Sequence, residues 1–186
     1  MGQQPLLTTE RLILRPFQLS DAGKIQKLAG DVQVANGTVN IPHPYNDGMA
    51  GQWIGKHLAG WQSRTSAIYA ITLKSNASLM GCVGLHNIEY NKFDSSKAQL
   101  GYWLGVPYWG QGYGTEAAKR LTEFGFKRLN LDLIYGQHFS RDPSPGRILQ
   151  KIGMEHVKTK SSATRINMIS EDLEYYEIWA MAETNS

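Results

Sequence analysis

A cluster of glycines stands directly before a helical pattern near residue 110. In the stretch WGQGYGTEA, Gly110, Gly112 and Gly114 fall within five positions, and the apolar stripe of a helix begins after them. Glycine inside a regular element costs stability, so such a cluster indicates either a tight turn or a close backbone contact. A strand, a glycine-rich turn and a helix in that order form an anion site, because the free amides and the dipole of the helix start attract negative charge. The pattern therefore favours a phosphate-binding loop.

The spacing of the glycines fits neither of two common phosphate motifs. In GQGYG the third glycine comes one residue too early for the dinucleotide fingerprint GxGxxG. Gly105 and Gly110 have the spacing of a P-loop, but Gln111 and Gly112 stand where that loop needs Lys and then Ser or Thr. A different phosphate-bearing ligand is therefore expected, and a plain tight turn is the alternative.

Periodicities of apolar residues predict helices and strands around this loop. In residues 98–106 apolar side chains alternate with Gln99, Gly101, Trp103 and Gly105, which predicts a strand with two glycines on one face. Glycines on one face of a strand indicate a bulge or a ligand against the backbone. The other predicted strands are 10–17, 67–74, 79–90, 132–139, 154–160 and 173–181, and the predicted helices are 20–30, 49–61, 115–129 and 142–153.

Length and composition are typical of one globular domain, expected over residues 5–183. The chain has 186 residues, of which 41% are hydrophobic and 19% charged. A net charge of +3 is too mild to indicate a nucleic-acid partner. The only cysteine, Cys82, lies in the apolar run LMGCVGL and is interpreted as a buried small hydrophobic residue. No apolar stretch is long enough to span a membrane and no signal peptide is recognisable, so a cytoplasmic location without membrane contact is expected.

The glycine stretch resembles the acyl-CoA pyrophosphate loop of the GNAT superfamily of N-acetyltransferases. That loop reads Gln or Arg, two residues, Gly, one residue, then Gly or Ala, and Trp109, Gly112 and Gly114 occupy these places. Trp in the first place is typical of the ribosomal-protein (RimJ/RimL-like) N-terminal acetyltransferase branch. The stretches TTERLILRPF, IPHPY and GRILQKIGM also resemble that branch, and the resemblance spans roughly residues 8–157.

The resemblance implies an α+β GNAT fold. The expected architecture is a mostly antiparallel, twisted mixed sheet of about seven strands with helices on both faces, in which strands 98–106 and 132–139 splay apart. It also implies acetyl-CoA as cosubstrate and no metal. In the family, amides of the loop, here residues 110–115, bind the CoA pyrophosphate, and the pantetheine arm lies between the two splayed strands.

The same resemblance implies which residues meet the cosubstrate. A backbone amide near Leu104 or Gly105 would polarise the thioester carbonyl. The full set expected to bind acetyl-CoA is Leu104, Gly105, Val106, Trp109, Gly110, Gln111, Gly112, Tyr113, Gly114, Thr115, Asp142 and Arg147.

The residues for proton transfer depart from the family pattern. Relatives in this branch often have Glu where this chain has Gln99, and an amide cannot accept a proton at neutral pH. The branch usually reads Asn-Pro-Ala-Ser-Gly where residues 142–146 read Asp-Pro-Ser-Pro-Gly, so Pro145 replaces the Ser. Leu149 stands where other members have a Tyr that protonates the thiolate. Asp142 also has a structural explanation as a helix N-cap.

Four residues are candidates for the catalytic roles. Gln99 keeps the position of the family base, and Ser144 lies one position from the missing Ser. His86 and His138 are candidate bases, although each also has an ordinary explanation as a packed or surface histidine.

The acceptor pocket is expected around the irregular stretch and helix at 38–61 and the turn at 160–173. Its predicted lining is His43, Tyr45, Trp53, Asn87 and Trp103. Core packing is the competing explanation for Trp53 and for Trp61 further along the same helix.

A site without a strong base favours an acceptor amine of low pKa. An α-amine with a pKa near 8 is neutral in roughly one molecule in ten at pH 7, whereas a lysine amine near 10.4 is neutral in about one in 2,500. We therefore expect direct acetyl transfer to a primary amine, with a peptide or protein N-terminus favoured. A CoA-binding protein with lost or regulatory catalysis and an acetyltransferase for a polyamine, antibiotic or amino acid stay open, as does a homodimer by strand exchange.

Overall fold

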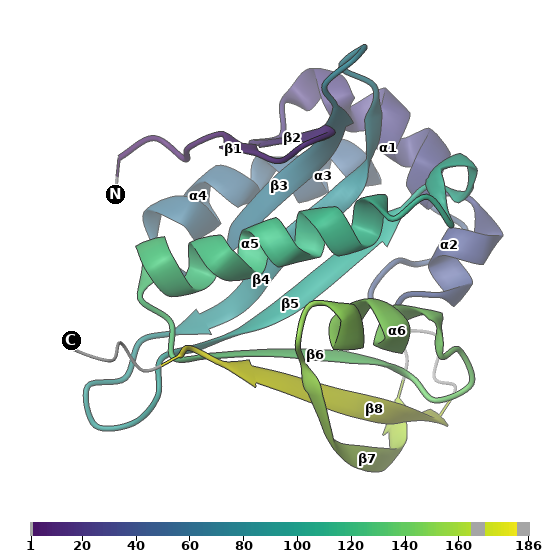
Figure 1. The fold of residues 1–186 in the computed structure, drawn as a ribbon. Coiled ribbons are helices and arrows are strands. Elements are labelled where there is room, and N and C mark those ends of the chain that lie inside the picture. Colours follow the sequence, from purple (N-terminus) through teal and green to yellow (C-terminus); the bar gives the residue numbers. More distant parts are fainter. Residues whose placement is uncertain (1, 165–169, 182–186) are drawn as a thin grey trace.

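One mixed sheet organises the protein. The structure, a computed structural model, describes residues 2–164 and 170–181. Within these residues eight strands pair in the order β1-β2-β3-β4-β5-β6-β8-β7, and only the β5–β6 pairing is parallel (Figure 1). The strands are β1 (Leu7–Thr8), β2 (Leu12–Arg15), β3 (Ala67–Leu73), β4 (Leu79–Glu89), β5 (Lys97–Leu104), β6 (Leu133–Phe139), β7 (Glu155–Thr164) and β8 (Ser170–Trp179).

Helices cover both faces of the sheet, as the family resemblance implies. The helices are α1 (Ala22–Ala29), α2 (Val32–Asn36), α3 (Met49–Gly55), α4 (His57–Gln62), α5 (Tyr113–Leu129) and α6 (Ser144–Lys151). Helices α5 and α6 pack on one face, and α1 and α3 pack on the other (Figure 1). In the part of the chain that is described, no helix is both long enough and apolar enough to cross a membrane.

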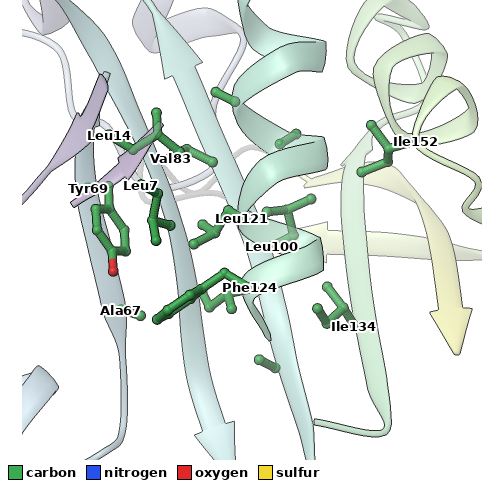
Figure 2. Close-up of a cluster of buried hydrophobic side chains, with 14 of the residues drawn as sticks. Leu7, Leu14, Ala67, Tyr69, Val83, Leu100, Leu121, Phe124, Ile134 and Ile152 are labelled. Carbon is green, nitrogen blue, oxygen red and sulfur yellow. The ribbon is translucent and has the colours of Figure 1, made fainter. Parts of the chain in front are cut away.

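The larger core lies between α5 and the sheet. Leu121 and Phe124 of α5 point toward the sheet, where Tyr69 of β3 and Leu100 of β5 belong to the same core (Figure 2). The period-two pattern explains this arrangement, because alternate residues of each strand face α5. Cys82 faces the other side and is only 3% exposed, and burial raises the pKa of its thiol, which confirms the interpretation of a packed hydrophobic residue.

The local predictions differ from the structure at several points, of which helix α2, absent from the predicted elements, is one. The predicted helix 49–61 is divided at Lys56 into α3 and α4, since the glycines within it lower helix propensity. Val106 belongs to a 3-10 turn with Pro107 rather than to β5. Helix α6 begins at Ser144, although the Asp142 carboxylate still accepts a hydrogen bond from the Ser144 amide at 2.9 Å. The eighth strand, β1, is too short for a periodicity to reveal it.

Candidate active site

The sheet opens between β5 and β6. The two strands pair only where residues 97–99 meet residues 133–135, although both strands are described in full (Figure 1). A cavity of about 390 Å³, named here the sheet cavity, is lined by residues 100–103 of β5 and 137–139 of β6. Pro145 of α6 and Trp53 of α3 line it as well, although these helices cover opposite faces of the sheet. The cavity therefore lies in the opening itself.

A second cavity adjoins the first at the end of β5. This loop cavity has a volume of about 680 Å³ and is lined by the glycine loop, the start of α5 and one side of α6. The residues that line both cavities are Gly37, Thr38, Tyr102, Trp103 and Pro145. Because they share these residues, the two cavities form one cleft that an elongated ligand can follow from the glycine loop into the opening.

The hydrogen bonds of β5 decide which backbone groups face the opening. The amide of Gly105 donates to the carbonyl of Met80 at 2.9 Å, so it points toward β4. Successive amides of a strand point to opposite sides, and those of Leu104 and Tyr102 consequently point toward the opening. Two amides are predicted to polarise a thioester. The amide of Gly105 already donates to β4, so only the amide of Leu104 is directed toward a ligand in the opening.

The glycine loop leaves three helix amides without a partner inside the helix. Gly110 and Gly112 have φ values of 74° and 81°, a conformation that few other residues adopt. Gly112 is the N-cap of α5, and its carbonyl accepts the first helical hydrogen bond, from the amide of Glu116. The amides of Tyr113, Gly114 and Thr115 precede that bond and are therefore free for an anion.

Arg11 fastens the glycine loop to the start of β2. Its guanidinium donates to the Gln111 carbonyl at 3.0 Å and lies over the Tyr113 ring, 4.5 Å from the centroid. Glu116 holds Arg11 in place by accepting from its Nε at 2.7 Å and from its amide at 2.8 Å. Thr9 donates to the same carboxylate at 2.6 Å. These donors and the charge of Arg11 outweigh partial burial and lower the pKa of Glu116, so the carboxylate stays ionised.

Replacing Glu116 by alanine is expected to lower the free energy of unfolding by about 2 kcal/mol at pH 7, because hydrogen bonds to a charged group are lost. The loop should also lose part of its order, which weakens binding of the anionic ligand. Thermal unfolding and ligand titration measure the two effects. Glu123→Ala on the same helix is the matched control, and equal behaviour of the two variants would contradict the anchoring role.

Most of the residues predicted to bind the cosubstrate line the loop cavity. The structure places there Leu104, Trp109, Gly110, Gly112, Tyr113, Gly114, Thr115, Asp142 and Arg147. Gly105, Val106 and Gln111 are not in its lining. The side chain of Gln111 instead donates to the Pro107 carbonyl at 2.9 Å and closes the turn.

Positive charge gathers on the α6 side of the loop cavity. Arg141, Arg147 and Lys151 line it together with the single carboxylate of Asp142. Arg147 donates to the Ser144 hydroxyl at 3.0 Å, and Arg141 forms an ion pair with Glu171. Free amides on one side and cations on the other suit a ligand with more than one phosphate.

The predicted catalytic residues are divided between the two cavities. Gln99, His86 and His138 line the sheet cavity together. Ser144 lies in the loop cavity, where it is exposed, and the structure does not bring it to the other three. His86 is the cross-strand neighbour of Gln99, whose side-chain oxygen accepts from Asn87 at 3.3 Å.

Three of the five predicted acceptor residues line the sheet cavity. These are Tyr45, Trp53 and Trp103. His43 and Asn87 are exposed and absent from the lining, and the Asn87 side chain hydrogen-bonds Gln99, which does line the cavity. Part of the turn predicted to complete the pocket, residues 165–169, lies outside the described residues.

The two histidines of the sheet cavity, His86 and His138, have different surroundings. Burial lowers the pKa of His86, so the ring is neutral at pH 7. His138 is only 5% exposed, and its Nδ1 lies 2.9 Å from the carbonyl of Phe139. A carbonyl accepts only from a protonated nitrogen, so Nε2 of the neutral ring carries the lone pair, and it has no hydrogen-bond partner.

Sequence reasoning missed Tyr102, which lines both cavities. Its hydroxyl donates to the carbonyl of Pro145 at 2.8 Å. The alternation along β5 places Tyr102 on the same face as Leu100 and Leu104 and so predicts a core residue. Only the opening of the sheet, which the local pattern does not encode, gives its ring access to the cleft.

Comparison with known proteins identifies the family. A model of the acetyltransferase (GNAT) domain matches residues 11–155. The chain is 32% identical over 133 residues to "Uncharacterized N-acetyltransferase p20" of Bacillus licheniformis, across 69% of this chain and 70% of that protein.

Solved structures show the same fold at low identity. The ribosomal L7/L12 α-N-protein acetyltransferase RimL, in complex with coenzyme A, matches with a TM-score of 0.84 and 14% identity over 94% of this chain and 98% of that one. The microcin C7 self-immunity acetyltransferase MccE, in complex with acetyl-CoA and AMP, matches with a TM-score of 0.81 and 18% identity over 92% and 94% of the two chains. The family match, the relative and the open sheet agree: this chain belongs to the GNAT acetyltransferases, as an acetyl-CoA-dependent N-acetyltransferase.

Proposed function

We propose that the enzyme acetylates the α-amine of a peptide or protein N-terminus. The observation that carries this choice is the chemistry of the sheet cavity. Among the described residues that line it there is no Asp or Glu, whereas Lys56 and several amide side chains are present. A polyamine is held through carboxylates that pair with its multiple positive charges, and this lining offers none.

The orientation of acetyl-CoA in the cleft follows from charge. The pyrophosphate lies at the free amides of residues 113–115, and the cations of α6 face its outer oxygens. The pantetheine arm then extends past the shared residues into the opening, where the backbone of β5 has no partner strand. The thioester then lies where the two cavities meet at Tyr102 and Trp103, and the acetyl group points into the sheet cavity. Leu104 follows these residues in β5 and lines the loop cavity, so its amide is next to the thioester.

The chemistry needs a neutral amine and a group that removes its proton. The amine nitrogen forms a bond to the acetyl carbon, and the Leu104 amide stabilises the negative charge on the carbonyl oxygen. The C–S bond breaks, and the sulfur leaves with the electron pair. His86 and His138 both line this cavity and are the candidate bases for the proton of the nitrogen, since Gln99 can hydrogen-bond the amine but cannot deprotonate it.

A larger fraction of an α-amine is already neutral at pH 7, so its reaction depends less on a strong base in the site. At pH 7 the neutral fraction of an α-amine exceeds that of a lysine amine by roughly 250-fold. RimL, which shares the fold, is described as an α-N-protein acetyltransferase, and this supports the same acceptor class.

The test is free-thiol release from acetyl-CoA with three matched acceptors between pH 7 and 9. They are a peptide with a free N-terminus and no lysine, an N-blocked peptide with one lysine, and spermidine. We expect the first to react at least about 100-fold faster at pH 7, with the advantage shrinking as the pH rises. Faster reaction of either other acceptor contradicts the proposal, and silence with all three favours a CoA-binding protein with regulatory or lost catalysis.

A further inference from the structure

The departing thiolate of CoA has no obvious proton donor at the positions that the family resemblance indicates. Pro145 and Leu149 occupy those positions, and both line the sheet cavity. Neither side chain carries a hydroxyl. Ser144, one residue away, is exposed in the loop cavity and is not among the residues that line the sheet cavity. A donor must therefore come from another element.

The residues where the two cavities meet are the candidates for the proton donor. A cosubstrate that has its phosphates in the loop cavity and its acetyl group in the sheet cavity must pass the five residues that line both. Only Thr38 and Tyr102 among these five carry a side-chain hydroxyl. The Thr38 hydroxyl donates to the Ala35 carbonyl at 3.3 Å, within its own loop, whereas the Tyr102 hydroxyl reaches across the opening from β5 to α6.

We propose that the Tyr102 hydroxyl donates the proton to the departing thiolate of CoA. Before the reaction its hydrogen bond to the Pro145 carbonyl holds it beside the position where the family hydroxyl is missing, and the same hydrogen turns from that carbonyl to the sulfur as the thiolate forms. As the C–S bond breaks, the sulfur takes the electron pair and then the phenolic proton. Because its pKa is raised, the phenol oxygen is a stronger base than the thiolate and regains a proton in the same step. That proton is balanced by the one that the amine nitrogen releases to the base of the sheet cavity, so the net products are the amide and the free thiol.

The surroundings of Tyr102 keep its phenol protonated at neutral pH. Burial, and to a smaller degree the negative charge of Asp142, raise the pKa of the phenol. The group therefore enters each turnover protonated. A phenol of this kind donates a hydrogen bond to the thiolate before the proton is transferred, which stabilises the charged sulfur.

The first test needs no acceptor, so it is independent of the proposed N-terminal substrate. The ultraviolet absorbance of the thiolate reports the pKa of CoA bound to the enzyme. Tyr102→Phe keeps the ring and should raise that pKa by about one unit relative to wild type, because the hydrogen bond to the charged form is lost. The affinity for acetyl-CoA should stay within about threefold, which shows that the site is still formed.

The second test is turnover with any accepted amine. Tyr102→Phe should lower kcat by about 100-fold with little change in the KM for acetyl-CoA, whereas Tyr90→Phe outside the cleft should not lower it. If Tyr102→Phe does not fold, 3-fluorotyrosine at position 102 replaces it; its lower phenol pKa should move the alkaline limb of the kcat profile to lower pH. An unchanged thiol pKa and kcat would overturn the proposal, as would Thr38→Val producing both effects in place of Tyr102→Phe.

Discussion

Replacement of Gly112 by valine is expected to weaken acetyl-CoA binding by about 100-fold. Gly112 has a φ of 81° at the N-cap of α5, and a β-branched residue is strained there. The loop must then change its path, and the amides of residues 113–115 no longer converge on the pyrophosphate. A loss of about 3 kcal/mol, the worth of one or two hydrogen bonds to a charged group, corresponds to this change in affinity.

Gly48 provides a matched control for the backbone strain. It has a φ of 82° at the N-cap of α3, and a side chain there would meet no atom within 4 Å. Gly48→Val therefore carries a similar strain away from the loop cavity, and its Kd for acetyl-CoA should stay within about twofold of wild type. Isothermal titration of both variants, with thermal unfolding to match their stability, makes the comparison. Normal affinity in Gly112→Val would contradict the assignment of the loop.

Stability is expected to fall by about 2 kcal/mol between pH 7.5 and pH 5, mainly through His57. The ring packs 4.3 Å from that of Trp53 and 5.3 Å from that of Phe17 between centroids, and neither of its nitrogens has a hydrogen-bond partner. Burial, with a smaller contribution from His86, lowers the pKa of His57 to about 4. In the unfolded chain His57 is protonated below about pH 6.5, whereas in the folded chain it stays neutral down to much lower pH. The free energy of unfolding therefore has its full value above pH 6.5 and decreases as the pH falls.

Phenylalanine at position 57 should remove the part of this pH dependence that His57 contributes, about 2 kcal/mol. The substitution keeps an aromatic ring beside Phe17 and Trp53 and deletes both unpartnered nitrogens. Urea unfolding of wild type and His57→Phe at half-unit steps from pH 7.5 to 5 measures the difference. Carboxylates such as Glu116 have a lowered pKa and lose their contribution only at more acid pH. His86, whose pKa burial also lowers, adds to the loss in both proteins and therefore cancels in the comparison. Parallel curves for the two proteins would show that His57 is not the group responsible.

Local patterns in the sequence predict most helices and strands of this fold, because each element depends on the spacing of apolar residues within a few positions of one another. Alternation within residues 98–106 predicts β5, and the glycines near residue 110 predict a helix start that the structure places at Tyr113. Helix α2 escaped the prediction although Asp31 caps it, with the carboxylate accepting from the Gln33 amide at 2.8 Å. Five residues are too few for a helical period to stand out.

The candidate site is formed by segments that lie far apart in the sequence, and local sequence patterns do not show how such segments are arranged in space. The opening between β5 and β6 depends on where a parallel pairing stops, and no single strand records that. It exposes Tyr102, which the alternation assigns to the core, and it separates Ser144 from His86 and His138. His43 sits in an irregular loop whose path sequence reasoning could not give, and its side chain faces solvent rather than the cavity.

The most direct test of acetyl transfer to an α-amine uses one peptide that carries both a free N-terminus and an internal lysine. The peptide is incubated with acetyl-CoA and the enzyme at pH 7, and fragmentation mass spectrometry locates the added acetyl group. The account predicts the acetyl group on the α-nitrogen in at least nine of ten product molecules, in line with the roughly 250-fold difference in neutral amine. An acetyl group found mainly on the lysine side chain would contradict it.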